Sequence, residues 1–140
     1  MIEEAEQIAK SLVKANQELA EETTYEVVLY SDWRLPTIEE LITLIDFMAS
    51  NPASFNKNIR PSNFWSSTVG KNKKNAWYVY FYYGYVQNQT RDYYNYVCCV
   101  RDGENGLEWS ADSIEAMSQY GAIEYANNLI APVAFRKETL

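Results

Sequence analysis

Large apolar side chains and tyrosines alternate along residues 76–82, and this period of two constrains the fold more than any other feature of the chain. Successive side chains of a β-strand point to opposite faces of a sheet, so the pattern separates the two sets. The sets are Trp77, Val79 and Phe81, and Tyr78, Tyr80 and Tyr82. We expect Trp77 and Phe81 to be buried in the core, and Tyr80 and Tyr82 to be exposed on the other face.

Apolar residues at helical spacing predict one helix over residues 2–22 and another over about 112–129. Between them, Thr37 and Glu40 form a T-x-x-E capping box that opens a third helix. The Asn-Pro pair at 51–52 is expected to end that helix. Its predicted buried stripe is Leu41, Leu44, Ile45 and Met48.

Runs rich in aromatic and β-branched residues predict several short strands, and Tyr83-Gly84 predicts a turn. Besides the strand above, these runs are 25–30, 85–86, 96–100, 107–109 and 132–135. Residues 51–75 are expected to be mostly loop, with Phe64-Trp65 as a buried anchor. Helices and strands together predict an α+β fold with a sheet of three or more strands in the middle of the chain.

The residue types present exclude much side-chain chemistry. Histidine is absent, so neither an imidazole metal site nor a Ser-His or Cys-His pair can form. The two cysteines, Cys98 and Cys99, are adjacent and would point to opposite faces of a strand, which is poor geometry for a disulfide. Acids and amides do not show the spacing of a calcium-binding loop. We therefore predict no metal, no cofactor and no catalytic residue.

Charge and hydropathy limit the classes of partner and the locations that we expect for this chain. The net charge of −7 disfavours a general nucleic-acid binder, although residues 47–91 carry six basic and no acidic side chains and could face an acidic partner. The chain has no apolar run of the length that a membrane span needs, and its first residues do not resemble a secretory signal. These features suit a cytoplasmic or virion-associated protein and do not fix the compartment.

Tyrosine density is the feature that points to function. Eight of the twelve tyrosines fall between Tyr78 and Tyr96, among Asn, Gln and Thr residues. Tyrosine supplies rigid contact area and the amides supply adaptable hydrogen bonds, a mixture typical of binding surfaces. The alternative is ordinary packing in a core or between copies of the chain. The candidate ligand-binding residues are Tyr78, Tyr80, Tyr82, Tyr83, Tyr85, Gln87, Asn88, Gln89, Arg91, Asp92, Tyr93 and Tyr94.

Three motifs resemble a known family. The stretch 32–41 reads DWRLPTIEEL, 64–68 reads FWSST, and 76–81 with 96–101 reads AWYVYF and YVCCVR. In this order and spacing, over residues 32–101, they resemble Lcl-type C-terminal domains, which are related to formylglycine-generating enzymes. The resemblance implies a C-type lectin-like fold, with two or more helices on a small, mostly antiparallel twisted sheet. Residues 1–140 would then form a single domain.

The same resemblance implies a binding protein rather than an enzyme. Some members are variable proteins of diversity-generating retroelements in phages, bacteria, archaea and their viruses, where mutagenesis at adenines rewrites chosen codons. The Tyr, Asn, Asp and Thr mixture before Cys98 fits that output. Other members are invariant adhesins or carbohydrate-binding modules. The partner would be a protein or glycan on a cell or virus surface, and self-association is left open.

One departure from the family concerns the C-terminal part. A GL-x-W strand and its helix usually precede the WRLPT motif, whereas here they follow it, at 106–109 and beyond. Residues 104–140 are thus expected to be an additional strand–helix element, which either completes the fold in a rearranged order or is a remnant of a second unit. The enzyme relatives use well-separated cysteines that this chain lacks, so enzymatic activity is not carried over.

Overall fold

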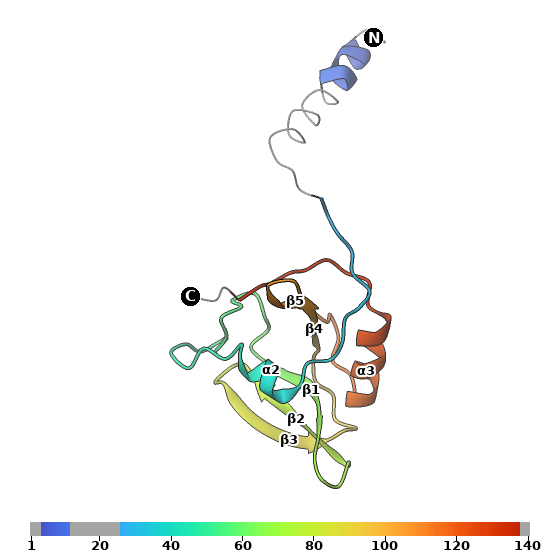
Figure 1. Cartoon of the computed structure of the whole chain (residues 1–140). Helices are drawn as coiled ribbons and strands as arrows, with labels where there is room; N and C mark the ends of the chain where they lie inside the picture. The colour runs from blue at the N-terminus through green and yellow to red at the C-terminus, as the bar shows by residue number, and fades with distance from the viewer. Residues whose placement is uncertain (1–3, 12–25, 138–140) are drawn as a thin grey trace.

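The computed structural model describes residues 4–11 and 26–137. In chain order its elements are α2 (Ile38–Ile42), β1 (Asn63–Val69), β2 (Asn75–Tyr80), β3 (Tyr85–Thr90), β4 (Cys98–Gly103), β5 (Gly106–Asp112) and α3 (Gln119–Asn128) (Figure 1). Residues 4–11 are also helical and exposed to solvent, which confirms that part of the helix predicted over 2–22. The rest of that predicted helix lies outside the described residues. The α+β prediction is confirmed.

The strands form two antiparallel sheets rather than one. β1, β2 and β3 pair in that order, with Tyr78 opposite Gln87 and Tyr80 opposite Tyr85. The predicted turn between β2 and β3 is present, and Gly84 lies there at a φ of 83°, a conformation that L side chains rarely adopt. A Cβ on Gly84 would also lie 2.9 Å from Cγ2 of Ile45, so the turn requires glycine for space as well.

β4 and β5 form the second sheet, and two outlying segments attach to it. Arg34 and Val100 exchange backbone hydrogen bonds of 2.9 Å, which fixes the chain before α2 against β4. On β5, Trp109 bonds through its backbone to Phe135 and is itself 1% exposed. The segment after residue 104 therefore supplies a buried core residue and a paired strand.

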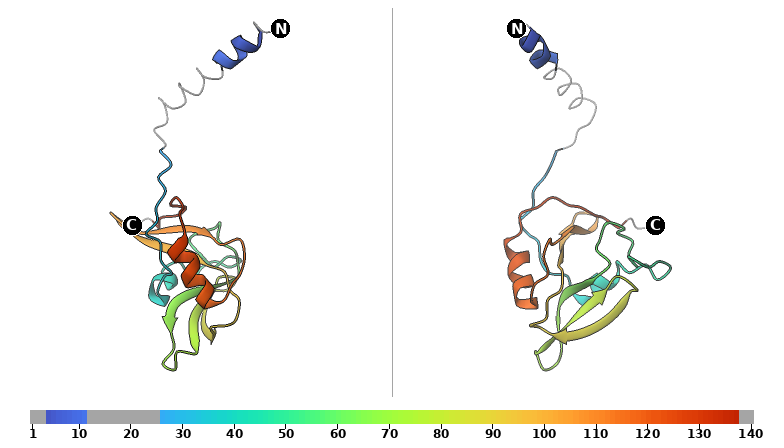
Figure 2. Two further views of the ribbon diagram at one scale, coloured as in Figure 1. Left: turned by 90° about the vertical axis from the view of Figure 1, so that its right-hand side faces the viewer. Right: turned by 180° about the vertical axis from the view of Figure 1, so that it is seen from behind.

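Two hydrophobic clusters form the core, one on each face of the three-stranded sheet. Neighbours on β1 divide between them, because Phe64 belongs to the cluster that includes α2 residues and Trp65 to the cluster that includes Ala122 and Ala126 of α3. α3 packs beside β1 (Figure 2), where the Trp65 indole donates to the carbonyl of Met117 over 2.8 Å. Both faces of the sheet are thus covered over β1 and β2, whereas β3 at its edge is largely exposed.

This double covering corrects the expected exposure of the tyrosine face. Tyr78 is only 7% exposed and packs with Trp65, while Tyr80 and Tyr82 are half-buried. On the other face, Phe81 is buried as expected, but Trp77 is only partly buried. The period of two identified the strand correctly, but α3 covers the face that was expected to be open.

The helix after the capping box is much shorter than predicted. The box itself is present: the Thr37 hydroxyl accepts from the backbone of Glu40, whose carboxylate accepts from the backbone N–H of Thr37. The helix ends at Ile42, and the following turn pairs Ile45 with Ser54. Met48 is consequently 95% exposed rather than buried, whereas Leu41, Leu44 and Ile45 are buried as predicted.

Several other boundaries differ from the sequence expectations. Residues 26–30 and 132–135 form no strand and make only isolated pairs, Tyr30 with Ala131 and Phe135 with Trp109. Phe64-Trp65 is the expected buried anchor, but it lies on a strand rather than in a loop. α3 begins only after Ser118, whose hydroxyl accepts from the N–H of Gly121. Asp112 belongs to β5 and the Ser113 hydroxyl accepts from the N–H of Val97, so the helix predicted from about residue 112 starts later.

Across the part of the chain that the structure describes, no helix combines the length and apolar character needed to cross a membrane.

Replacing Trp109 by alanine should lower the free energy of unfolding by about 3–5 kcal/mol, because it leaves a large cavity in the core. Phe47→Ala is the matched control, since Phe47 is exposed, and should change stability by less than about 0.5 kcal/mol. Urea denaturation followed by tryptophan fluorescence measures both. Equal midpoints for Trp109→Ala and wild type would show that the C-terminal segment is not part of the folding core.

The ion pair at the capping box should make stability depend on pH. Hydrogen bonds from Arg34 and the Thr37 backbone lower the pKa of Glu40 below its usual value. The resulting stabilisation is present above the ordinary glutamate pKa and is lost as the pH falls through the lowered one. Glu40→Gln should therefore unfold at a lower temperature than wild type at pH 7, and the two melting curves should converge at acidic pH. A difference in melting temperature that stays constant as the pH is lowered would contradict this.

Candidate functional site

Tyr80, Tyr82, Tyr83 and Tyr85 form an aromatic group around the turn between β2 and β3; we call it the turn cluster. Phe81 points into the core, so its neighbours project outward. The rings of Tyr82 and Tyr83 meet edge to face at 4.5 Å between centroids, and those of Tyr80 and Tyr82 stack at 6.0 Å. Backbone N–H groups of Asn51 and Ala53 donate to the carbonyls of Tyr82 and Phe81, which fixes the turn. The cluster is a supported aromatic surface.

β3 continues this surface as an exposed edge strand. Five of its six residues are exposed, and Gln89 is half-buried. Its amides are held in place from the sheet side: Tyr78 Oη donates to Gln87 at 3.0 Å, Asn75 to Asn88 at 3.0 Å and Asn95 to Gln89 at 2.8 Å. The polar side chains of the strand are thus positioned before any ligand arrives.

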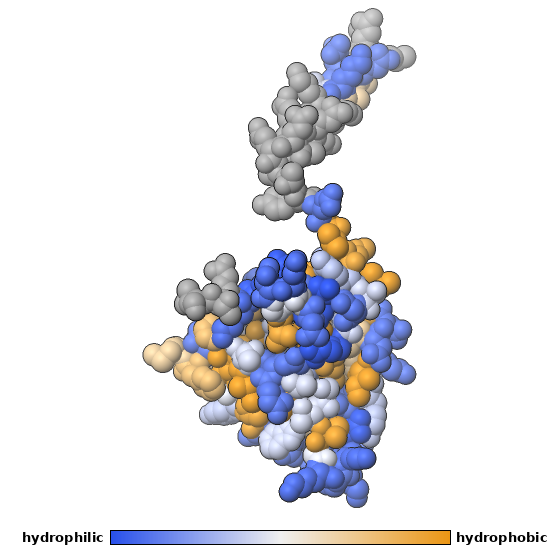
Figure 3. Space-filling view, viewed as in Figure 1, coloured by the Kyte–Doolittle hydropathy of each residue, from blue (hydrophilic) through white to orange (hydrophobic). Residues whose placement is uncertain are grey.

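A second aromatic group lies at the far end of β3, about 17 Å away by the rise of a strand. Tyr93 and Tyr94 are well exposed, the latter at 72%. Arg91 beside them donates to Gln119 at 2.8 Å, and its guanidinium lies over the Tyr120 ring at 4.1 Å. Lysines of the turn between β1 and β2 border this end, and Figure 3 shows the lower end of the molecule as strongly hydrophilic.

The structure thus places most of the candidate residues along one edge, from the turn cluster through β3 to the 91–94 segment; we call this the edge surface. Tyr78 is the exception: it is buried, and burial raises its pKa. Its hydroxyl group donates to Gln87 at 3.0 Å and orients that side chain. The residues that the structure assigns to the edge surface are Tyr80, Tyr82, Tyr83, Tyr85, Gln87, Asn88, Gln89, Arg91, Asp92, Tyr93 and Tyr94.

Sequence reasoning missed three neighbours of this surface. Phe47 and Met48 are highly exposed in a loop whose later residues bond to the turn cluster. The short helix before them was expected to continue and bury Met48. Tyr120 joins the surface through its contact with Arg91 and is half exposed. Its sequence position, at the start of a helix, gave no sign of this neighbour.

The cysteines lie away from the edge surface and are poorly suited to thiolate chemistry. Both are free and buried, one in each hydrophobic cluster. Burial raises the pKa of Cys99 to about 12 and that of Cys98 further, so both thiols stay protonated at neutral pH. Among the residues described, no group of three or more His, Cys, Asp or Glu side chains lies in a metal-binding arrangement.

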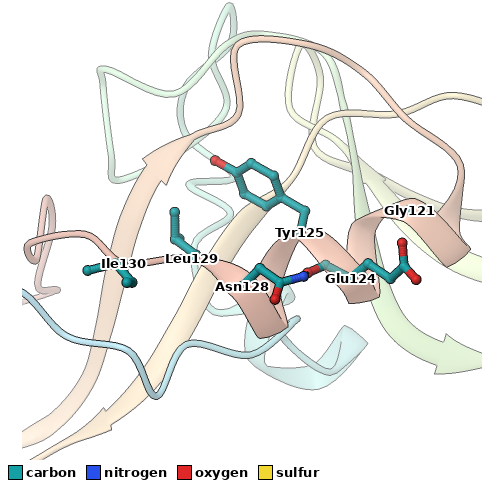
Figure 4. A pocket seen from close by; sticks show the side chains of 6 residues that line it. All are labelled: Gly121, Glu124, Tyr125, Asn128, Leu129 and Ile130. Atoms are coloured by element: carbon teal, nitrogen blue, oxygen red, sulfur yellow. The ribbon is translucent and has the colours of Figure 1, made fainter.

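Two hollows occur elsewhere on the molecule. A cleft of about 1530 Å³ lies between β5, the loop carrying Phe55 and the segment ending at Lys137. Two arginines of the cleft share one carboxylate, since Glu108 accepts from both Arg101 and Arg136. The other hollow is shallow and follows the end of α3, where the Glu124 and Tyr125 side chains point in different directions (Figure 4). Neither hollow includes a candidate residue.

Comparison with known sequences identifies the family. Searches of curated proteins and of solved structures gave no significant match. The sequence model of the Lcl C-terminal domain family matches residues 2–101, which include the DWRLPT and FWSST motifs and all of the edge surface. The match spans well over half of the chain, so this protein belongs to the Lcl C-terminal domain family.

Proposed function

We propose that this protein is a non-catalytic binding domain and that the edge surface is its recognition site. The observation that carries the proposal is the separation of residues along the hairpin. The buried residues are Phe81, Val79 and Trp65. The exposed residues, close to them along the same hairpin and its neighbouring strand, are Tyr83, Tyr85 and Asn88. One short segment thus holds both the folding core and an open set of contact residues.

The exposed set has the chemistry of a binding surface. Tyr83 and Tyr85 are 55% and 54% exposed, yet their rings contact each other and the rest of the turn cluster. Rings held by their neighbours lose little freedom on binding, and each offers an apolar face with a hydroxyl group. The amides of β3 add hydrogen bonds. This composition suits a protein or glycan ligand displayed on a cell or virus surface.

We further propose that the scaffold is C-type lectin-like and that the exposed positions are varied by a diversity-generating retroelement. Adenine-directed mutagenesis of Asn codons yields Tyr, Asp and Thr among other residue types, and all three occur between β2 and β4, with tyrosine the most frequent. Exposed positions such as Tyr93 tolerate replacement because they contribute little folding energy. Buried positions such as Val79 do not, because a smaller side chain leaves a cavity.

The surroundings of the reactive side chains support a role in binding rather than in catalysis. The thiols are buried and protonated, and the buried carboxylate of Glu108 is neutralised by two arginines. The acid on the edge surface, Asp92, is exposed. A solvent-exposed carboxylate is suited to ligand contact rather than to acid–base catalysis.

Sequencing the gene across its native population tests this proposal. We expect substitutions at adenine-bearing codons of exposed positions, including Tyr83, Tyr85, Asn88, Tyr93 and Tyr94. The buried residues Trp65, Val79 and Phe81 should be the same in every copy and serve as the internal control. A segment that is identical throughout the population would contradict diversification. It would favour instead an invariant adhesin or carbohydrate-binding module, which a glycan array would then examine.

A further inference from the structure

β3 has one free edge, and its outward backbone groups are identified by the ladder. Among residues 4–11 and 26–137, β3 pairs with β2 alone, and it lies on the outside of its sheet (Figure 1). The N–H of Arg91 donates to the carbonyl of Lys74 at 3.0 Å, which continues the ladder one residue past the strand. Along an antiparallel strand, the backbone N–H and C=O groups of successive residues point alternately toward and away from the neighbouring strand. Those of residues 85, 87 and 89 therefore point toward β2. The backbone groups of Val86 and Asn88 therefore point away from the sheet.

These outward groups have no partner among residues 4–11 and 26–137. The N–H of Thr90 also points outward, while its carbonyl accepts from Tyr93 at 3.1 Å. Proteins usually protect such an edge with charged residues, proline or a covering segment. β3 reads YVQNQT and has neither charge nor proline. The edge is open to another extended segment.

The two ends of β3 indicate what that segment should contain. At the start of β3 lie the rings of the turn cluster, which favour apolar or aromatic contacts. At the other end lie Arg91 and the turn at 71–74, with its three lysines. Asp92 is the single acidic residue between positions 47 and 95, so this end carries a net positive charge. A segment with acidic residues at one end and apolar residues at the other complements both.

We propose that the ligand is a protein that adds an extended segment to β3 as a fourth strand, with the acidic end of that segment beside Arg91 and the lysine turn. This inference rests on the proposed binding function and narrows it to strand addition, in which main-chain hydrogen bonds give affinity and side chains give selectivity. Main-chain pairing also suits a variable surface: substitutions on β3 change selectivity while the backbone contacts remain.

The test uses linear dodecapeptides displayed on phage, selected against the full chain. We expect the selected peptides to carry Asp or Glu near one end and β-branched or aromatic residues along the rest. Affinity of a synthetic selected peptide is then compared between wild type and two variants at one position. Asn88→Pro removes an outward N–H and should weaken binding about tenfold or more. Asn88→Ala loses the same side chain but keeps that N–H, so it should weaken binding clearly less than Asn88→Pro does.

A second measurement does not depend on how the proline variant folds. N-methylation of alternate peptide backbone nitrogens removes the pairing groups on one edge of the ligand strand. Methylating one alternate set should abolish binding, and methylating the other set should leave it nearly unchanged. Replacing the three lysines of the 71–74 turn by glutamine should weaken binding and reduce its dependence on ionic strength.

The outcomes separate strand addition from the broader binding function. Peptides that bind equally well with either set methylated, or that bind Asn88→Pro as tightly as wild type, would overturn strand addition. Strand addition would also be overturned if the peptide selection yields no binder while a glycan array or a library of folded proteins yields one. A dimer that Asn88→Pro converts to a monomer would show that a second copy of the chain occupies the edge. If Tyr83→Ala and Tyr85→Ala also leave every binder unaffected, the proposed recognition surface itself fails.

Discussion

Burial of both faces of the three-stranded sheet is the constraint on which the rest of the structure depends. Phe64 and Trp65 stand next to each other on β1 and enter different clusters, so both faces of β1 and β2 are covered, while β3 stays largely exposed. A sheet covered in this way can offer a ligand only its edge and its turns. The exposed tyrosines therefore gather at the turn cluster and at the 91–94 segment, at the two ends of β3.

The C-terminal segment covers the second face of the three-stranded sheet. α3 closes the Trp65 face, where Gln119 donates to the carbonyl of Ser66 at 3.2 Å, and Trp109 fills the other cluster. The family match ends at residue 101, yet these contacts come from beyond it. The edge surface lies within the matched region, and α3 borders it where Gln119 and Tyr120 contact Arg91.

Local patterns in the sequence predicted the secondary structure better than they predicted which residues are buried. The alternation along β2, the turn at Gly84 and the capping box at Thr37 depend on near neighbours, and all three were predicted. The burial of Tyr78 depends on α3, more than 40 residues away, which no local period can reveal. The exposure of Met48 follows from an early helix end and the pairing of Ile45 with Ser54. The sequence predicted the candidate residues as one group, but it did not predict that they would lie along an edge of the sheet.

The central claim is that the edge surface contributes contact and not folding. Thermal unfolding of a variant with serine at Tyr83, Tyr85, Asn88, Tyr93 and Tyr94 tests it directly, with Phe81→Ala as the comparison. We predict that the fivefold variant melts within about 5 °C of wild type, because exposed side chains contribute little to stability. The single core substitution should lower the melting temperature by about 10 °C or more. A fivefold variant that loses as much stability as Phe81→Ala would contradict the division between scaffold and surface.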